Sequence, residues 1–166
     1  MVLELRDVFI GGKELPIDTD LAMTDFDVNG ENPISNLHFR GSVANSADVV
    51  ALKGVATFTY SALCDRCAEP TTRDYSYNIN HIIVNELSNE QDADEDFVVV
   101  DNMQLDLGEL IRSDVILDLP VKFLCNPDCK GICVGCGKRL NFEECVCKVE
   151  IDPRLAKLAE FFDDDE

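Results

Sequence analysis

Eight cysteines constrain this chain of 166 residues more than any other feature. Six lie between residues 125 and 147, and the other two form the upstream sequence Cys64-Asp-Arg-Cys67. Thiolates bind zinc tetrahedrally, and two cysteines separated by two residues in a tight turn can face one ion. Eight cysteines therefore suffice for two four-thiolate sites.

The composition indicates a globular cytosolic chain. Hydrophobic residues make up 46% of the sequence, which is enough for a core, and no run reaches the ~20 apolar residues that a membrane-spanning helix needs. The N-terminal residues lack the pattern of a signal peptide. Because a reducing cytosol keeps thiols reduced, metal binding is favoured over a disulfide scaffold, which stays as an alternative.

The charge is strongly acidic, with 14 basic against 33 acidic side chains and a net charge of −19. Such a surface repels nucleic-acid phosphates and favours basic partners, although high charge also serves solubility alone. Residues 125–150 differ, because they hold four cations and four acids. Lys130, Lys138, Arg139 and Lys148 are therefore the candidate contacts to RNA or a partner, or they offset thiolate charge.

Apolar and polar residues alternate along the first half of the chain, which predicts strands over residues 2–10, 37–43, 50–60 and 75–83. Residues 18–35 look irregular, residues 97–101 predict a further short strand, and the acidic residues 88–96 predict a mobile loop. The Cys64–Cys67 motif then falls at a hairpin tip or at the end of a strand pair.

Two helices are expected after the strands. Asp106 and Glu109 form a capping-box pattern, followed by an apolar stripe, and Leu119-Pro120 ends or kinks this helix. Asp152-Pro153 begins a short amphipathic C-terminal helix before an acidic tail. The expected fold class is α+β, with an antiparallel sheet or partly closed barrel, one or two helices and a zinc-knuckle-like segment. Residues 1–124 would form the body, and residues 125–166 would pack with it as one unit.

The cysteine spacing predicts one site from Cys133, Cys136, Cys145 and Cys147, in which Gly137 permits a tight turn. The economical pairing puts Cys64, Cys67, Cys125 and Cys129 on a second ion. Another pairing joins Cys125 and Cys129 to Cys133 and Cys136, and the sequence does not choose between them. Closed four-thiolate sites are structural, so zinc is the expected cofactor, with an iron–sulfur cluster as an alternative.

The sequence contains no recognised catalytic motif. The phosphate-binding, dinucleotide-binding, hydrolase and zinc-protease patterns are all missing, so we expect neither an enzyme nor a small-molecule substrate. The two histidines, His38 and His81, fit ordinary strand positions better than metal-ligand positions. The alternative function is a thiol redox protein or sensor that uses Cys64 and Cys67.

The motif Cys64-x-Arg-Cys67, the segment Asp106-Leu-Gly-Glu109 and the run Cys129-Lys-Gly-Ile-Cys133-x-x-Cys136-Gly-x-x-Leu-Asn141 appear together with Asp152-Pro-Arg154. In this combination the chain resembles the YceD-like family of large ribosomal RNA accumulation proteins over residues 37–162. Val134 departs from the family pattern, which commonly has proline there. The resemblance implies a bacterial cytosolic factor for accumulation of large-subunit (23S) ribosomal RNA during ribosome assembly. It also implies a link to a small zinc-containing ribosomal protein, and the expected partner is a basic ribosomal protein or a pre-50S particle.

Overall fold

The computed structural model describes residues 1–23, 26, 32–85 and 97–147. The chain divides into two compact units: the first contains Met1–Ala62 and Pro70–Phe123, and the second contains Leu63–Glu69 and Leu124–Glu166. The loop that carries Cys64 and Cys67 thus belongs to the same unit as the later cysteines. The acidic loop and the C-terminal helix predicted from sequence lie outside the described residues.

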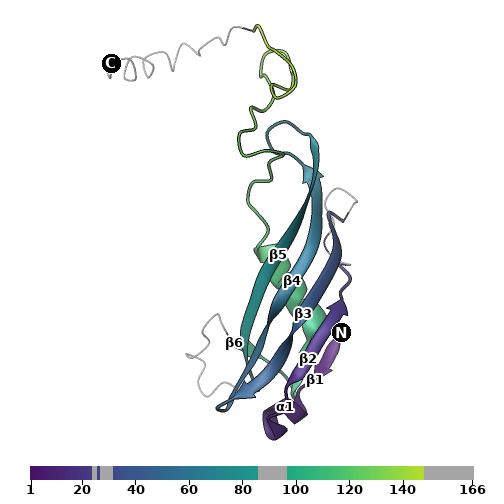
Figure 1. The fold of residues 1–166 in the computed structure, drawn as a ribbon, viewed down its shortest axis with the longest axis vertical. Coiled ribbons are helices and arrows are strands. Elements are labelled where there is room, and N and C mark those ends of the chain that lie inside the picture. Colours follow the sequence, from purple (N-terminus) through teal and green to yellow (C-terminus); the bar gives the residue numbers. More distant parts are fainter. Residues whose placement is uncertain (24–25, 27–31, 86–96, 148–166) are drawn as a thin grey trace, which may run out of the picture. The chain divides into compact units, whose positions relative to one another are not determined.

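The first unit is built on a five-stranded sheet in the order β2-β3-β4-β5-β6 (Figure 1). Its strands are β2 (Leu15–Asp20), β3 (Ile34–Ser46), β4 (Val49–Leu63), β5 (Pro70–Val84) and β6 (Phe97–Val99). β2, β3 and β4 pair antiparallel in sequence order, whereas β6 runs parallel to β5. A separate antiparallel pair joins β1 (Val2–Glu4) to β7 (Gln104–Asp106).

Two helices accompany these strands in the described part of the chain. The first is α1 (Arg6–Gly11), which ends at Gly12 in a left-handed conformation. The second is α2 (Leu107–Leu117), which begins at Asp106, whose carboxylate accepts a hydrogen bond from the Glu109 backbone N–H. The predicted cap, start and end of this helix are confirmed, because α2 stops before Pro120.

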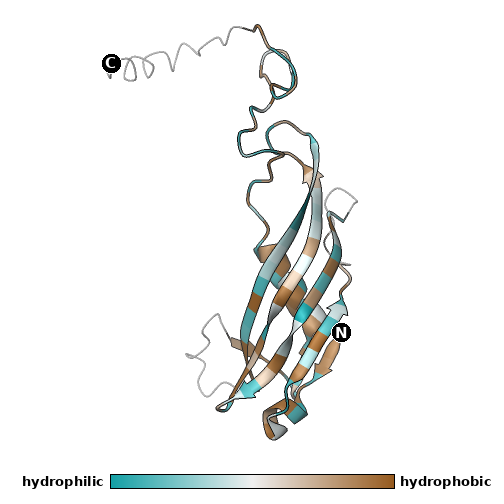
Figure 2. Cartoon of the chain, in the orientation of Figure 1, coloured by the Kyte–Doolittle hydropathy of each residue, from teal (hydrophilic) through white to brown (hydrophobic). Residues whose placement is uncertain are grey.

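The core lies on one face of the sheet. Alternate residues of β3 and β4 point into it, including the fully buried Phe39, Val43 and Leu52, and Figure 2 shows the alternation of apolar and polar residues along the long strands. Leu107, Ile111 and Val115 of α2 have no exposed surface and belong to the same core. Apolar residues at every second strand position thus pack against apolar residues at every third or fourth helix position in one core.

The expected fold class is confirmed, since the chain is mostly sheet with two helices in the described residues and a cysteine-rich C-terminal region. The sheet is open rather than closed into a barrel. The strand predicted over residues 2–10 is wrong beyond Glu4, because α1 follows it. Leu5 and Val8 are both buried at helical spacing, and the Asn45 side-chain amide donates to the carbonyls of Val8 and Phe9.

The expectation of irregular structure over residues 18–35 is also wrong at both ends, where β2 and β3 extend. Asp18 and Asp20 lie opposite Arg40 and His38 in the β2–β3 register. Acidic residues on the exposed face of a two-sided strand obscure the apolar period, and their cationic partners on the next strand cannot be identified from a local window.

Candidate metal centre

The first thiol pair is held by the tight loop that connects β4 to β5. The Ala68 N–H donates to the Cys64 carbonyl at 2.8 Å, and the Cys64 N–H donates to the Glu69 carbonyl at 2.9 Å. Ala68 adopts a φ of 53°, which closes the turn. The Cys64–Cys67 motif therefore lies at a hairpin tip, as its position between two strand patterns predicted.

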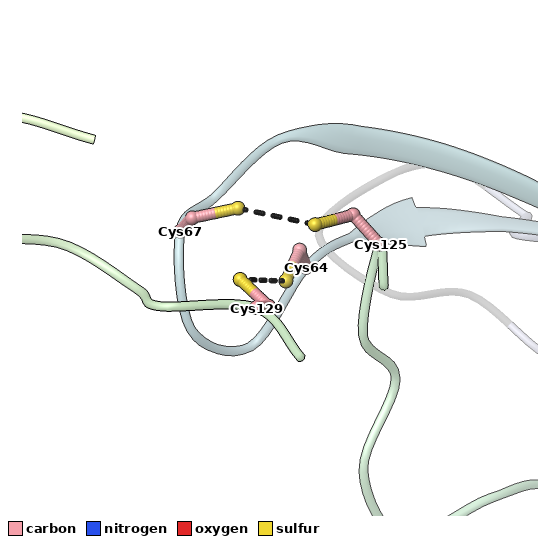
Figure 3. A group of neighbouring side chains, drawn as sticks. All are labelled: Cys64, Cys67, Cys125 and Cys129. Atoms are coloured by element: carbon pink, nitrogen blue, oxygen red, sulfur yellow. Dashed lines mark hydrogen bonds between the residues drawn. The ribbon is translucent and has the colours of Figure 1, made fainter. Parts of the chain in front are cut away.

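Four thiols meet around this tip, as Figure 3 shows. The sulfurs of Cys64 and Cys129 are 3.8 Å apart, those of Cys67 and Cys125 are 3.5 Å apart, and all four lie within 4.8 Å of one another. We name these four residues the first thiol group. A tetrahedral ion with metal–sulfur bonds of about 2.3 Å places its sulfurs about 3.8 Å apart, so the spacing fits such an ion.

The surroundings of the first thiol group supply hydrogen-bond donors. The Asn141 amide nitrogen lies 3.1 Å from the Cys129 sulfur and 3.8 Å from the Cys125 sulfur. The Arg66 guanidinium donates to the Cys129 carbonyl at 2.8 Å. Cys64, Cys67 and Cys129 are buried, so the Asn141 amide takes the place of water as a hydrogen-bond donor to sulfur.

The second thiol group contains Cys133, Cys136, Cys145 and Cys147, whose sulfurs also lie within 4.8 Å of one another. The Cys145 sulfur is 3.6 Å from that of Cys136 and 3.2 Å from that of Cys133. The Gly137 N–H donates to the Cys133 carbonyl at 2.8 Å, and Gly137 adopts a φ of 72°. Only glycine adopts this left-handed conformation without strain, which explains the residue after the Cys133–Cys136 motif.

The thiols within each group differ in acidity. Burial raises the pKa of Cys64, but backbone N–H groups of Cys125, Arg66 and Cys67 outweigh it and bring the pKa to about 6. A hydrogen bond from Cys145, followed by backbone N–H groups, lowers the pKa of Cys133 to about 6. Burial and the neighbouring sulfurs raise the pKa of Cys125 to about 12.

In the second group, hydrogen bonding with Cys145 and Cys136 raises the pKa of Cys147 to about 12. Each group thus combines a thiol that ionises readily with one that resists ionisation beside its neighbours. A bound cation removes this mutual repulsion, and uptake of metal by such a group releases protons. The donor set is therefore chemically suited to a divalent metal ion that prefers sulfur.

The structure brings Cys125 and Cys129 to Cys64 and Cys67, and not to Cys133 and Cys136. Neither histidine joins a thiol group. His38 lies between the carboxylates of Asp18 and Asp20, at 3.1 and 2.8 Å, and His81 contacts Asp114 at 2.7 Å. Both histidines therefore pair with acids of the first unit.

Of the four candidate contact cations, three lie in the described residues. Arg139 forms an ion pair with Glu69 and lies 5.3 Å from the centre of the Phe142 ring. The Lys138 ammonium donates to the Glu144 carbonyl at 3.4 Å, and Lys130 is exposed. Lys148 lies outside the described residues.

Sequence reasoning did not identify Asn141 as a thiol contact, although the residue stands in the motif Gly137-x-x-Leu-Asn141. Its position between Cys136 and Cys145 predicts a contact with the second thiol group, whereas its amide contacts sulfurs of the first group. Neither helix of the described residues has the length and apolar character that a membrane span requires.

The fold and the site define a class: an acidic β-sheet protein with a cysteine-rich unit that gathers eight thiols into two closed groups of four. The family model described as "Large ribosomal RNA subunit accumulation protein YceD" matches residues 52–162. This chain belongs to that family. The matched range includes every cysteine of both thiol groups.

Curated relatives support the assignment. A maize protein named "Large ribosomal RNA subunit accumulation protein YCED homolog 1, chloroplastic" is 24% identical over 161 residues, covering 79% of this chain and 55% of the maize protein. An uncharacterized protein of Mycobacterium bovis is 31% identical over 121 residues, covering 71% of this chain and 58% of that protein. The chain therefore spans little more than half the length of these relatives. No solved structure matches it.

Proposed function

We propose that this chain is a non-enzymatic factor that supports accumulation of large-subunit (23S) ribosomal RNA during ribosome assembly in the cytoplasm. The observation that carries this proposal is the family match over residues 52–162, which includes most of β4, all of β5 and all eight thiols. The names of the family and of the maize relative both refer to large ribosomal RNA accumulation.

The partner that the charge favours is a basic ribosomal protein, free or within a pre-50S particle. Residues 1–124 carry 8 basic and 23 acidic side chains, a balance of −15. A field of this sign attracts Lys- and Arg-rich proteins and repels RNA backbones. Residues 125–150 balance four cations against four acids, so contact with RNA through Lys130 or Lys138 is a weaker, local addition.

We propose structural zinc as the cofactor of both thiol groups. Cys64, Cys67, Cys125 and Cys129 would hold one ion, and Cys133, Cys136, Cys145 and Cys147 would hold the other. Zinc bound by four thiolates has no open position for substrate, and it supplies a cross-link between distant segments of chain. Its role here would be to order the cysteine-rich segment, residues 125–147, as a surface to which a partner binds.

The alternative, a thiol redox protein, requires a reactive thiolate that solvent and substrate can reach. Cys64 is only 3% exposed and Cys67 is fully buried, and each thiol has further sulfurs as neighbours. A low pKa at Cys64 also suits a metal ligand. Burial therefore favours the structural interpretation.

The test is genetic complementation in a host that lacks its own copy. We expect a lower ratio of 23S to 16S RNA, restored by the wild-type chain, and co-sedimentation of that chain with pre-50S particles. Cys129→Ser separates the two functions, because it breaks the first thiol group and leaves Cys64 and Cys67 in place. Loss of complementation by Cys129→Ser supports the structural site.

Val134→Ala is the matched control, since its side chain is 95% exposed and it should complement fully. A normal 23S to 16S ratio in the deletion strain, or absence of the chain from pre-50S particles across growth conditions, would refute the proposed function. Full activity of Cys129→Ser combined with inactivity of Cys67→Ser would favour the redox alternative.

A further inference from the structure

Asn141 belongs to the loop closed by one thiol group, and its side chain contacts the other. It lies between Cys136 and Cys145, whose sulfurs are 3.6 Å apart in the second group. Its amide nitrogen nevertheless approaches the Cys129 sulfur at 3.1 Å and the Cys125 sulfur at 3.8 Å, both in the first group. The amide oxygen accepts the Lys130 N–H at 2.8 Å, which fixes the orientation of the amide.

We propose that Asn141 is a positioning residue that couples the two thiol groups, so that metal bound by the second group strengthens metal binding by the first. The proposal rests on the metal binding proposed above and is independent of the ribosomal role. Closing the second group holds residues 137–144 in one conformation, and that conformation points the Asn141 amide at the sulfurs of the first group.

Backbone contacts make this loop a rigid connection. The Leu140 N–H donates to the Gly131 carbonyl at 2.9 Å, and the Cys133 N–H donates to the Lys138 carbonyl at 2.8 Å. Both bonds cross a short hairpin in which Ile132 pairs with Arg139. Asn141 follows directly after Leu140, the last residue bonded across this hairpin. A displacement of the loop at its cysteine end therefore also displaces Asn141.

The hairpin also approaches the loop that carries the first thiol pair. A Cβ at Gly131 would lie 3.2 Å from the Arg66 carbonyl oxygen, and Gly131 adopts a φ of 77°. Arg139 forms its ion pair with Glu69, two residues after Cys67. The strand of the hairpin that leads to Asn141 is thus held against the Cys64–Cys67 loop.

The chemistry explains why an amide suits this position. Four thiolates around a divalent ion leave a net charge of −2 in a buried site, and N–H donors to sulfur spread that charge. Groups that hydrogen-bond a metal ligand commonly change metal affinity by about 10–100-fold when removed. Asn141 offers such donors to two ligands of one ion.

The first experiment measures metal release to a chromophoric chelator from the full chain loaded with two zinc ions. We expect Asn141→Leu to speed release of one ion by about tenfold or more, with the other unchanged. Alkylation during release, read by mass spectrometry, should label Cys64, Cys67, Cys125 and Cys129 first. Glu143→Gln is the matched control, two residues away without a contact to sulfur in the described structure, and should release both ions at the wild-type rate.

A second variant separates hydrogen-bond donation from loop anchoring. Asn141→Asp keeps the oxygen that accepts the Lys130 N–H but removes the donor and adds negative charge beside the sulfurs. We expect faster release than from Asn141→Leu. With cobalt in place of zinc, the sulfur-to-metal charge-transfer band of the first group should shift to longer wavelength, which general loosening of the loop would not produce.

Coupling is measured by a double-mutant cycle with Cys145→Ser/Cys147→Ser, which opens the second group. This change should accelerate release from the first group about tenfold when Asn141 is present and much less in the Asn141→Leu background. Additive effects would overturn the coupling, as would unchanged release from Asn141→Leu. A wild-type chain that binds no metal would overturn both this proposal and the proposed zinc sites, whatever its effect on ribosomal RNA.

Discussion

Gly41 and Gly54 face each other across β3 and β4, and the ring of Phe39 lies over both. A Cβ at Gly54 would come within 2.6 Å of the Arg40 carbonyl oxygen and of the Phe39 ring. Because backbone and a fully buried ring cannot both move away, we expect Gly54→Ala to lower the free energy of unfolding by about 1–3 kcal/mol. Denaturant titration followed by circular dichroism measures the change.

Gly11→Ala is the matched control, since a Cβ there meets nothing within 4 Å and Gly11 lies in a helix. It should leave stability unchanged or slightly raised. Equal destabilisation by both substitutions would show that the close approach at Gly54 has no energetic weight. The alternation over residues 50–60 puts Gly54 on the same face as Leu52 and Ala56, but a single sequence does not show that a ring on the neighbouring strand occupies the space of a side chain.

In the thiol groups, too, local spacing could be predicted from sequence, whereas contacts between distant residues could not. Spacing predicted two groups, because close pairs such as Cys133 and Cys136 can share an ion only through a local turn. It could not assign Cys125 and Cys129, since their partners lie about sixty residues upstream and only the β4–β5 hairpin brings them near. Asn141 escaped prediction because its sulfur contacts cross from one group to the other.

At the scale of elements, α2 depends on an ionised cap. The Glu109 backbone N–H donates to the Asp106 carboxylate and lowers its pKa from 3.8. A lowered folded-state pKa contributes stability above the unfolded-state pKa, and this contribution is lost as the pH falls through the folded-state value. We therefore expect the stability advantage of wild type over Asp106→Asn to stay constant between about pH 5 and pH 7 and to shrink below about pH 4.

Thermal unfolding at matched ionic strength, from pH 7 down to pH 3, measures this difference. Asparagine is a suitable comparison because it also caps helices but takes up no proton in this range. Parallel stability profiles for the two proteins across the whole range would contradict the prediction. The cap could be predicted from sequence, since Asp106 and Glu109 and the apolar stripe after them are all local signals.

Other elements could not be predicted from sequence, because contacts with distant residues define them. The helix α1 is too short to show a clear period, and its carbonyl partners come from Asn45 on β3. The three residues of β6 are too few to specify its parallel pairing with β5. Long elements with a regular period were therefore predicted better than short ones that tertiary contacts define.

At the scale of the whole molecule, the two units are stabilised by different kinds of core. Among its described residues, the first unit has eighteen that are buried in one apolar cluster. In the described part of the second unit, the buried cluster consists of three thiol side chains, with Leu124 and Cys125 packed against them. So small an apolar core cannot by itself offset the entropy of ordering the chain, and metal binding commonly supplies the difference.

Removal of metal should therefore unfold the second unit and leave the first folded. We expect protein purified without chelator to contain two zinc ions and no rapidly alkylated thiol, and chelation to expose all eight thiols. Hydrogen exchange should then lose protection in residues 124–147 while β3, β4 and the buried part of α2 keep theirs. Chelation of the Gly54→Ala variant separates the units further, because the substitution weakens only the first unit. Eight free thiols without metal in the native protein, or unchanged protection of residues 124–147 after chelation, would show that this unit is ordered by something other than a metal ion.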